Sequence, residues 1–223
     1  MAAKTVAERP MPTVANAHAA RLAAAGSGCH PYVEDLGRAV SSTQPRDLDD
    51  AVHLLCALYG RHPGLIDLAL MQSASGPDQG WLRNAAESFE RERLYLVRLT
   101  AAAGPMPSTP GSAETEAAML AQRHALETLA RSERSGCALG AATALVSDWR
   151  SVRPLLDRAA ARVGVDAPPL ALPDEESVTA ILLSAAVTPA VERAIRFGAE
   201  QLLLQHRALW DLLEARCEAR EGF

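Results

Sequence analysis

The sequence has almost no lysine, few aromatic residues and no long apolar run. Lys4 is the one lysine among 22 basic residues, and Phe, Trp and Tyr together make up 4% of the 223 residues. Two charge-free stretches, 135–147 and 177–191, are shorter than the roughly 18–20 apolar residues that a membrane-spanning helix needs. A membrane protein is therefore not expected, and the arginine- and alanine-rich composition is typical of a GC-rich bacterial genome.

The sequence also lacks an excess of positive charge, a secretory signal and paired cysteines. Asp and Glu number 27 against 22 Lys and Arg, so the net charge of −5 is opposite to the basic surface of a nucleic-acid-binding protein. The first 26 residues contain no uninterrupted apolar core, because Glu8, Arg9 and two prolines interrupt it. The four cysteines form no C-x-x-C pair, so neither a zinc site nor a dithiol motif is readable. We expect a soluble cytoplasmic protein with reduced thiols and no nucleic-acid partner.

Helical periodicity dominates the chain. Helix-forming residues fill nearly every periodic segment, and no stretch alternates apolar and polar residues for long, which argues against an extensive β-sheet. The segments 136–146 and 178–187 carry no charge and therefore predict helices that are surrounded by others. We predict an all-α fold, a multi-helical bundle of about seven to eight helices with buried central helices.

Prolines and glycines predict the domain organisation. Residues 1–28 are expected to be poorly ordered or to form a short N-terminal helix, and residues 29–223 to form a single helical bundle domain. Three prolines make residues 104–112 an extended Pro-rich connector, after which the helical pattern covers about residues 113–150. Pro154 is expected to kink this helix or to start a new one.

No catalytic or metal-binding motif is readable. The di-iron pattern of helical bundles requires Glu-x-x-His on two helices, whereas His124 followed by Glu127 reverses that order and occurs once. The sequence contains no recognisable Ser, His and Asp nucleophile arrangement and no Gly-rich phosphate loop. These absences favour a non-enzymatic protein.

Two histidines are candidate binding residues because apolar positions surround them on their helices. His206 lies in the middle of an apolar helical face, four residues after Leu202 and three before Leu209. A buried imidazole needs a partner, so we expect a hydrogen bond to a neighbouring helix; the alternative is an axial ligand or a proton carrier in a cavity. His124 lies on a helix with a narrow polar sector, and we expect it to be partly buried.

Arg93 is a third candidate. It projects among apolar positions of its helix, where an unpaired guanidinium would cost several kcal/mol. We expect a salt bridge to an acid on another helix or a side chain that reaches solvent. The alternative is an anchor for an anionic ligand.

Trp149, Arg150 and Arg153 form a cluster just before the expected kink. Two guanidinium groups beside an indole are able to hold a phosphate or a carboxylate, because arginine presents a planar fork of donors. In the competing interpretation Asp148 or Ser151 caps the restarted helix, and both arginines are solvated.

Two segments resemble a known family. Residues 60–67, GRHPGLID, and residues 137–154, CALGAATALVSDWRSVRP, look like an uncharacterised all-helical family, a domain of unknown function, from GC-rich alphaproteobacteria. This resemblance covers most of the chain beyond residue 30 and implies a helical fold without an assigned activity. A looser similarity to haem-oxygenase-like helical proteins implies that His18 would be their N-terminal histidine and that Gly136 and Gly140 would be their distal-helix glycines.

The sequence therefore leaves two functions open. The first is a non-enzymatic domain without a cofactor that binds a partner protein or a small anionic or apolar ligand, with these candidate binding residues: Arg93, His124, Trp149, Arg150, Arg153 and His206. The second is a haem- or metal-dependent oxidoreductase on a ferritin-like or haem-oxygenase-like bundle, in which haem or iron would be held by His18, His124 and His206.

Overall fold

A computed structural model describes residues 13–38, 45–73 and 76–221. These residues form nine α-helices, one short 3₁₀ helix and no strand, which confirms the all-α prediction, although the expected number of helices is slightly low. The elements are α1 (Val14–Ala25), η1 (Ser27–Cys29), α2 (Pro31–Arg38), α3 (Pro45–Tyr59), α4 (Leu65–Gln72), α5 (Pro77–Ala103), α6 (Ser112–Ala130), α7 (Cys137–Val163), α8 (Glu175–Ala185) and α9 (Pro189–Glu221).

An unexpected break separates α6 from α7. The sequence pattern predicts one helix over about 113–150, but α6 ends at Ala130 and α7 begins at Cys137. Gly136, the residue before α7, has a positive φ of 93°. This backbone conformation favours glycine and is incompatible with a continuous helix. Gly136 therefore marks the start of α7, and residues 131–136 separate it from α6.

Pro154 was expected either to kink the helix or to start a new one, and it lies inside α7, so the second alternative is wrong. A proline in a helix interior removes one backbone hydrogen bond and costs about 3 kcal/mol or more. Val152, Leu155 and Leu156 on both sides of Pro154 are buried. Burial of about 1.5–3 kcal/mol per large apolar side chain offsets that cost, so the helix continues.

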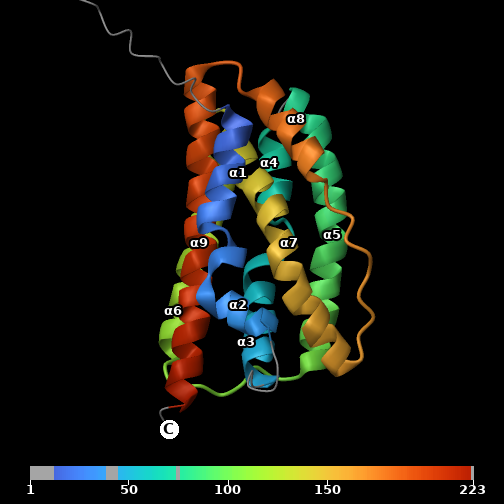
Figure 1. Ribbon diagram of the computed structural model, residues 1–223, viewed down its shortest axis with the longest axis vertical. Coiled ribbons are helices and arrows are strands. Elements are labelled where there is room, and N and C mark those ends of the chain that lie inside the picture. Colours follow the sequence, from blue (N-terminus) through green and yellow to red (C-terminus); the bar gives the residue numbers. More distant parts are fainter. Residues whose placement is uncertain (1–12, 39–44, 74–75, 222–223) are drawn as a thin grey trace, which may run out of the picture.

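Helices α7 and α9 form the centre of the bundle. Figure 1 shows α7 running through the middle of the molecule, between α9 on one side and α5 on the other. Gly140 of α7 and Gly198 of α9 allow the two backbones to approach closely. A Cβ built on Gly140 would lie 2.0 Å from the carbonyl oxygen of Ile195, and one on Gly198 would lie 2.0 Å from that of Cys137. The prediction of a buried central helix over 136–146 is confirmed.

The second charge-free segment, 178–187, is not a central helix. Helix α8 buries Val178, Ile181 and Leu182 on one face, whereas Leu183 and Val187 are exposed. Hydropathy alone did not reveal that only one face is covered. Among the described residues, no helix combines the length and apolarity required to cross a lipid bilayer.

Helix α1 packs on the upper half of the bundle. The Thr13 hydroxyl caps it by accepting the backbone N–H of Asn16 at 3.2 Å, and the helix lies against α7, α8 and α9. Residues 1–12 lie outside the described residues. One contiguous apolar core contains side chains from α1 through α9. The segment 104–111 carries no helix, as expected for a Pro-rich connector.

A buried ion-pair cluster fixes the C-terminal half of α9. Arg216 binds Asp50 of α3 with two hydrogen bonds of 3.0 Å, from Nε and from one terminal nitrogen. Arg220 pairs with Asp47 and Asp50, and both arginines donate to the Thr109 hydroxyl in the connector. These contacts join the C-terminal part of α9 to α3 and to the connector before α6.

Candidate functional site

A chain of buried polar side chains crosses the centre of the bundle. His206 of α9 is 1% exposed, and its Nδ1 lies 2.5 Å from Oδ2 of Asp148 in α7. Its Nε2 is hydrogen-bonded to the hydroxyl of Tyr59 at the end of α3. These two contacts satisfy both ring nitrogens of His206. The expected hydrogen bond to a neighbouring helix is therefore confirmed.

Asp148 is the centre of this chain. Its Oδ1 accepts the backbone N–H of Ser27 at 2.7 Å, and its Oδ2 accepts the Ser27 hydroxyl at 2.5 Å. Trp210 Nε1 donates to the same hydroxyl at 2.8 Å. Burial alone would raise the pKa of Asp148, but the hydrogen bonds from His206 and Ser27 outweigh burial and lower the pKa. Asp148 is thus an ionised hydrogen-bond acceptor, and the interpretation that it caps a restarted helix is wrong.

The polar chain leaves His206 no free nitrogen for a ligand. Burial and the negative charge of Asp148 raise the pKa of Tyr59 well above its ordinary value. The hydroxyl therefore stays protonated and donates a hydrogen bond to Nε2 of His206. Sequence analysis identified His206 but missed Tyr59 and Ser27. Their positions along the chain, 147 and 179 residues before His206, carry no local signal of this contact.

Arg93 is paired, as one of the sequence interpretations expected. It is 4% exposed, and one terminal nitrogen donates to Oδ2 of Asp67 in α4 at 2.5 Å. The other terminal nitrogen donates to Glu90 and, at 3.1 Å, to Nδ1 of His62. The two carboxylates neutralise the guanidinium, so Arg93 carries no spare charge for an anionic ligand.

Trp149 and Arg153 share one buried acid. Trp149 Nε1 donates to Glu92 at 2.9 Å, and Arg153 donates to the other oxygen of Glu92 at 2.8 Å. Arg153 also binds Asp157 at 2.7 Å and stacks over Tyr95, with 4.7 Å from guanidinium carbon to ring centroid. Burial raises the pKa of Glu92, and the hydrogen bonds from Trp149 and Arg153 oppose this. The interpretation that Arg153 is solvated is wrong.

Arg150 binds backbone carbonyl groups, whereas Arg153 binds carboxylates. One terminal nitrogen donates to the backbone carbonyls of Leu172 at 3.1 Å and Pro173 at 2.6 Å. It therefore fixes the loop before α8 against α7. Arg150 also lines a cavity between α1, α7 and α8, which sets it apart from Arg93 and Arg153.

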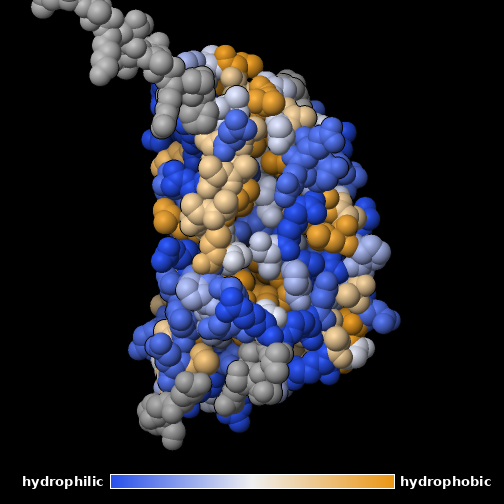
Figure 2. Space-filling view, viewed as in Figure 1, coloured by the Kyte–Doolittle hydropathy of each residue, from blue (hydrophilic) through white to orange (hydrophobic). Residues whose placement is uncertain are grey.

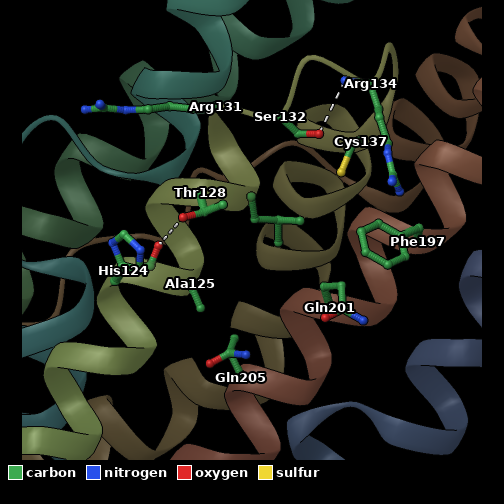
Figure 3. A pocket seen from close by; sticks show the side chains of 11 residues that line it. His124, Ala125, Thr128, Arg131, Ser132, Arg134, Cys137, Phe197, Gln201 and Gln205 are labelled. Carbon is green, nitrogen blue, oxygen red and sulfur yellow. Dashed lines mark hydrogen bonds between the residues drawn. The ribbon is translucent and has the colours of Figure 1, made fainter.

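A groove with a volume of about 660 Å³ lies between α6 and α9, and we call it the α6–α9 groove. Figure 3 shows Phe197 and Gln201 of α9 across the groove from Ala125 and Thr128 of α6. His124 lines the same groove, but its side chain is exposed, so the expected partial burial is wrong. The helical wheel places residues around one axis and does not determine which part of the wheel a neighbour covers.

The groove continues past Phe197 into a second cavity of about 530 Å³. Arg134 and Phe197 line both, and the Arg134 guanidinium carbon lies 5.5 Å from the centroid of the Phe197 ring. Arg131 lines the first cavity and Arg193 the second, whereas no Asp or Glu among the described residues lines either one. Figure 3 shows Arg134 extending down beside Phe197, while Arg131 extends outward from the rim.

A comparison with family models matches residues 22–221 to a family of unknown function, DUF6975. The chain belongs to DUF6975. Residues 60–67 and 137–154 predicted an all-helical family without an assigned activity. The match to a family of unknown function and the helical structure confirm this prediction. Searches of curated proteins and of solved structures found no match.

The three histidines that haem or iron would require are not brought together in this DUF6975 protein. His18 lines cavities beside α1, His124 lines the α6–α9 groove, and His206 is enclosed by Asp148 and Tyr59. No described cavity within the described residues contains two of these histidines.

Within the described part of the chain, one trio of metal-ligand side chains comes together. His30, Asp211 and Glu214 each place a ligand atom within 4.8 Å of the others. However, Nδ1 of His30 accepts the backbone N–H of Tyr32 at 3.3 Å, so its proton lies on Nε2, which contacts Asp211 at 3.0 Å. A nitrogen that carries a proton has no lone pair for a metal, and the hydrogen bond described within the trio is the one between His30 and Asp211.

Proposed function

We propose that this DUF6975 protein binds a small amphiphilic anion, a carboxylate on an apolar chain, in the α6–α9 groove. The observation that carries the proposal is an apolar groove with a basic rim and, in the described part of the chain, no acidic lining residue, in a protein whose net charge is −5. The proposed function is binding without a covalent step.

The interior of the groove suits an apolar chain. Its volume of about 660 Å³ falls within the range of roughly 300–1,000 Å³ that is typical of small-molecule sites. Leu129 and Cys137 form part of its buried wall, and Phe197, although aromatic, is 41% exposed. Covering such a ring with an apolar chain removes apolar area from water, which stabilises the complex by about 25 cal/mol per Å².

The rim suits a carboxylate. Arg134 is held over the Phe197 ring, and an ordered guanidinium is able to bind a carboxylate through two parallel hydrogen bonds. Cys137, in the wall, is the first residue of the 27-residue helix α7. The backbone N–H of Cys137 itself donates to the carbonyl oxygen of Arg134 at 2.9 Å. The contribution of this helix start is therefore the positive end of the helix dipole, which favours a nearby anion.

Isothermal titration with three eight-carbon probes tests the proposal: octanoate, octanol and octylammonium. We expect octanoate to bind at least about tenfold more tightly than octanol, because charge-assisted hydrogen bonds are about twice as strong as neutral ones. Octylammonium should bind most weakly at this groove. Equal affinities for the three probes would contradict the assigned charge preference.

Two substitutions locate the binding. Arg134→Gln should weaken octanoate at least about fivefold and leave octanol unchanged, since only the charged contact is removed. Arg98→Gln is the matched control, because Arg98 is an exposed arginine on α5 that lines none of the described cavities. Phe197→Ala should weaken both probes. Octanoate binding that survives both Arg134→Gln and Phe197→Ala would place the ligand elsewhere.

A further inference from the structure

The second cavity at the end of the α6–α9 groove carries its own arginine, and we call it the Arg193 cavity. Its volume is about 530 Å³, and Arg134 and Phe197 line it as well as the groove. Arg193 precedes Phe197 by four residues on α9, which corresponds to about 6 Å along the helix axis. Arg134 and Phe197 therefore lie at the junction of the two spaces.

Arg134 and Arg193 line the Arg193 cavity as two positive charges without an acidic partner. In the described part of the chain, no carboxylate lines this cavity or forms an ion pair with either arginine. Glu192, next to Arg193 in the chain, pairs with Arg196 instead. Two like charges that share a cleft repel each other and concentrate a positive potential there, which favours a bound anion.

One carboxylate leaves one of these two arginines unpaired. A guanidinium that binds a carboxylate through two parallel hydrogen bonds occupies both of its oxygens. A headgroup with two carboxylates gives each arginine a separate partner. The hydroxyl of Ser135 lines the same cavity and offers one further donor. The lining therefore favours a headgroup with two negative charges over one with a single charge.

The groove has room for the apolar chain that such a headgroup carries. Its lining residues on α9 extend from Phe197 to Gln205, about 12 Å along the helix axis. Figure 3 shows Arg134 and Phe197 near one end of the groove and Gln205 at the other. Along the edge formed by α9, Figure 2 shows apolar residues in orange between hydrophilic ones in blue. The charge at one end sets the direction of an amphiphile, with its headgroup beyond Phe197 and its chain towards Gln205.

We propose that the ligand of the α6–α9 groove carries two carboxylates on one headgroup, as does an acyl chain joined to an acidic amino acid. This inference rests on the proposed function and names the class of its ligand. One carboxylate binds Arg134 and the other binds Arg193, while the acyl chain lies in the groove against Phe197 and Leu129. The linking amide is able to pair with Gln201, whose side chain offers both a donor and an acceptor in the groove.

Isothermal titration of the full chain with N-octanoyl-aspartate and N-octanoyl-asparagine tests the proposal. The two probes have the same acyl chain and nearly the same shape, and they differ in the second negative charge. At an ionic strength of about 0.01 M we expect the aspartate probe to bind at least about threefold more tightly, a modest factor because both arginines are exposed. At about 1 M, where the Debye length is about 3 Å, this advantage should shrink. Equal affinities at the low ionic strength would overturn the proposal.

Two substitutions assign the two carboxylates. Arg193→Gln should lower the affinity of the aspartate probe to that of the asparagine probe and leave the latter unchanged, whereas Arg134→Gln should weaken both. Arg98→Gln is the control and should preserve the advantage of the aspartate probe, because Arg98 is exposed and lines neither space. Circular dichroism confirms that each variant is folded. An advantage that survives Arg193→Gln, or that disappears in Arg131→Gln instead, would refute the assigned position of the second carboxylate.

Octanoate, titrated into the same variants, separates this inference from the proposed function. Octanoate and the asparagine probe that both bind and are both weakened by Arg134→Gln, without an advantage for the aspartate probe, would refute only the second carboxylate. The groove would then remain a site for a single carboxylate. If none of the three probes binds, the proposed function fails and this inference fails with it.

Discussion

Replacement of His18 by leucine should change how the stability of the protein depends on pH. The imidazole is buried, has no hydrogen-bond partner, and its pKa is lowered by desolvation from 6.5 to about 4. In the unfolded chain the same group titrates near 6.5. Between these two values the unfolded state binds a proton that the folded state does not, so the histidine opposes folding progressively as pH falls.

The sign and size follow from proton linkage. Stability rises with pH wherever the unfolded state binds more protons, so the folded protein should lose stability as pH falls from about 6.5 to about 4. Each pKa unit corresponds to about 1.4 kcal/mol. At pH 5 the contribution of His18 is therefore a destabilisation of about 2 kcal/mol relative to pH 7.5. At pH 7.5, loss of two unpaired buried nitrogens should make His18→Leu more stable by about 1–3 kcal/mol.

Urea unfolding at pH 7.5 and at pH 5.0 measures both the stability gained by His18→Leu at neutral pH and its change on acidification. Other groups also titrate in this interval, so the useful quantity is the difference between His18→Leu and the unsubstituted protein at each pH. The advantage of His18→Leu should grow by about 2 kcal/mol at pH 5.0. Asn16→Leu, an exposed and non-titrating position on the same helix, should change stability equally at both pH values. An advantage of His18→Leu that is the same at both pH values would refute the reasoning.

Four further substitutions test close helix contact and buried polar groups, each by chemical denaturation. Gly140→Ala should destabilise by about 1–3 kcal/mol or more, because the new Cβ meets the backbone of α9, whereas Gly37→Ala meets nothing and should stabilise by about 0.5–1 kcal/mol. Arg93→Met should cost about 3–5 kcal/mol by stranding its carboxylate partner on α4; an unchanged melting temperature would contradict this. His206→Leu should also destabilise, by about 1–3 kcal/mol, since buried Asp148 loses a donor; a neutral result would contradict the polar chain.

The sequence by itself determined the local structure. Helix-forming residues and the absence of alternating segments set the all-α fold, because these preferences act within a few residues along the chain. Asp174 caps α8 by accepting the backbone N–H of Ser177 at 2.8 Å, and Pro189 begins α9, as expected for residues that stabilise or permit a helix start. Gly140, which carries no Cβ, allows the close contact between α7 and α9.

Only the tertiary structure decided which polar groups meet. Periodicity placed His206 and Arg93 on apolar faces, so their need for partners was predictable, but the identity of those partners was not. Asp148 contacts Ser27 from 121 positions away, and each such contact depends on how whole helices are arranged. The same reason explains why His124 is exposed and why Pro154 does not start a helix. A helical pattern fixes the direction of each side chain around its own axis, whereas burial and chemistry depend on which neighbouring helix covers it.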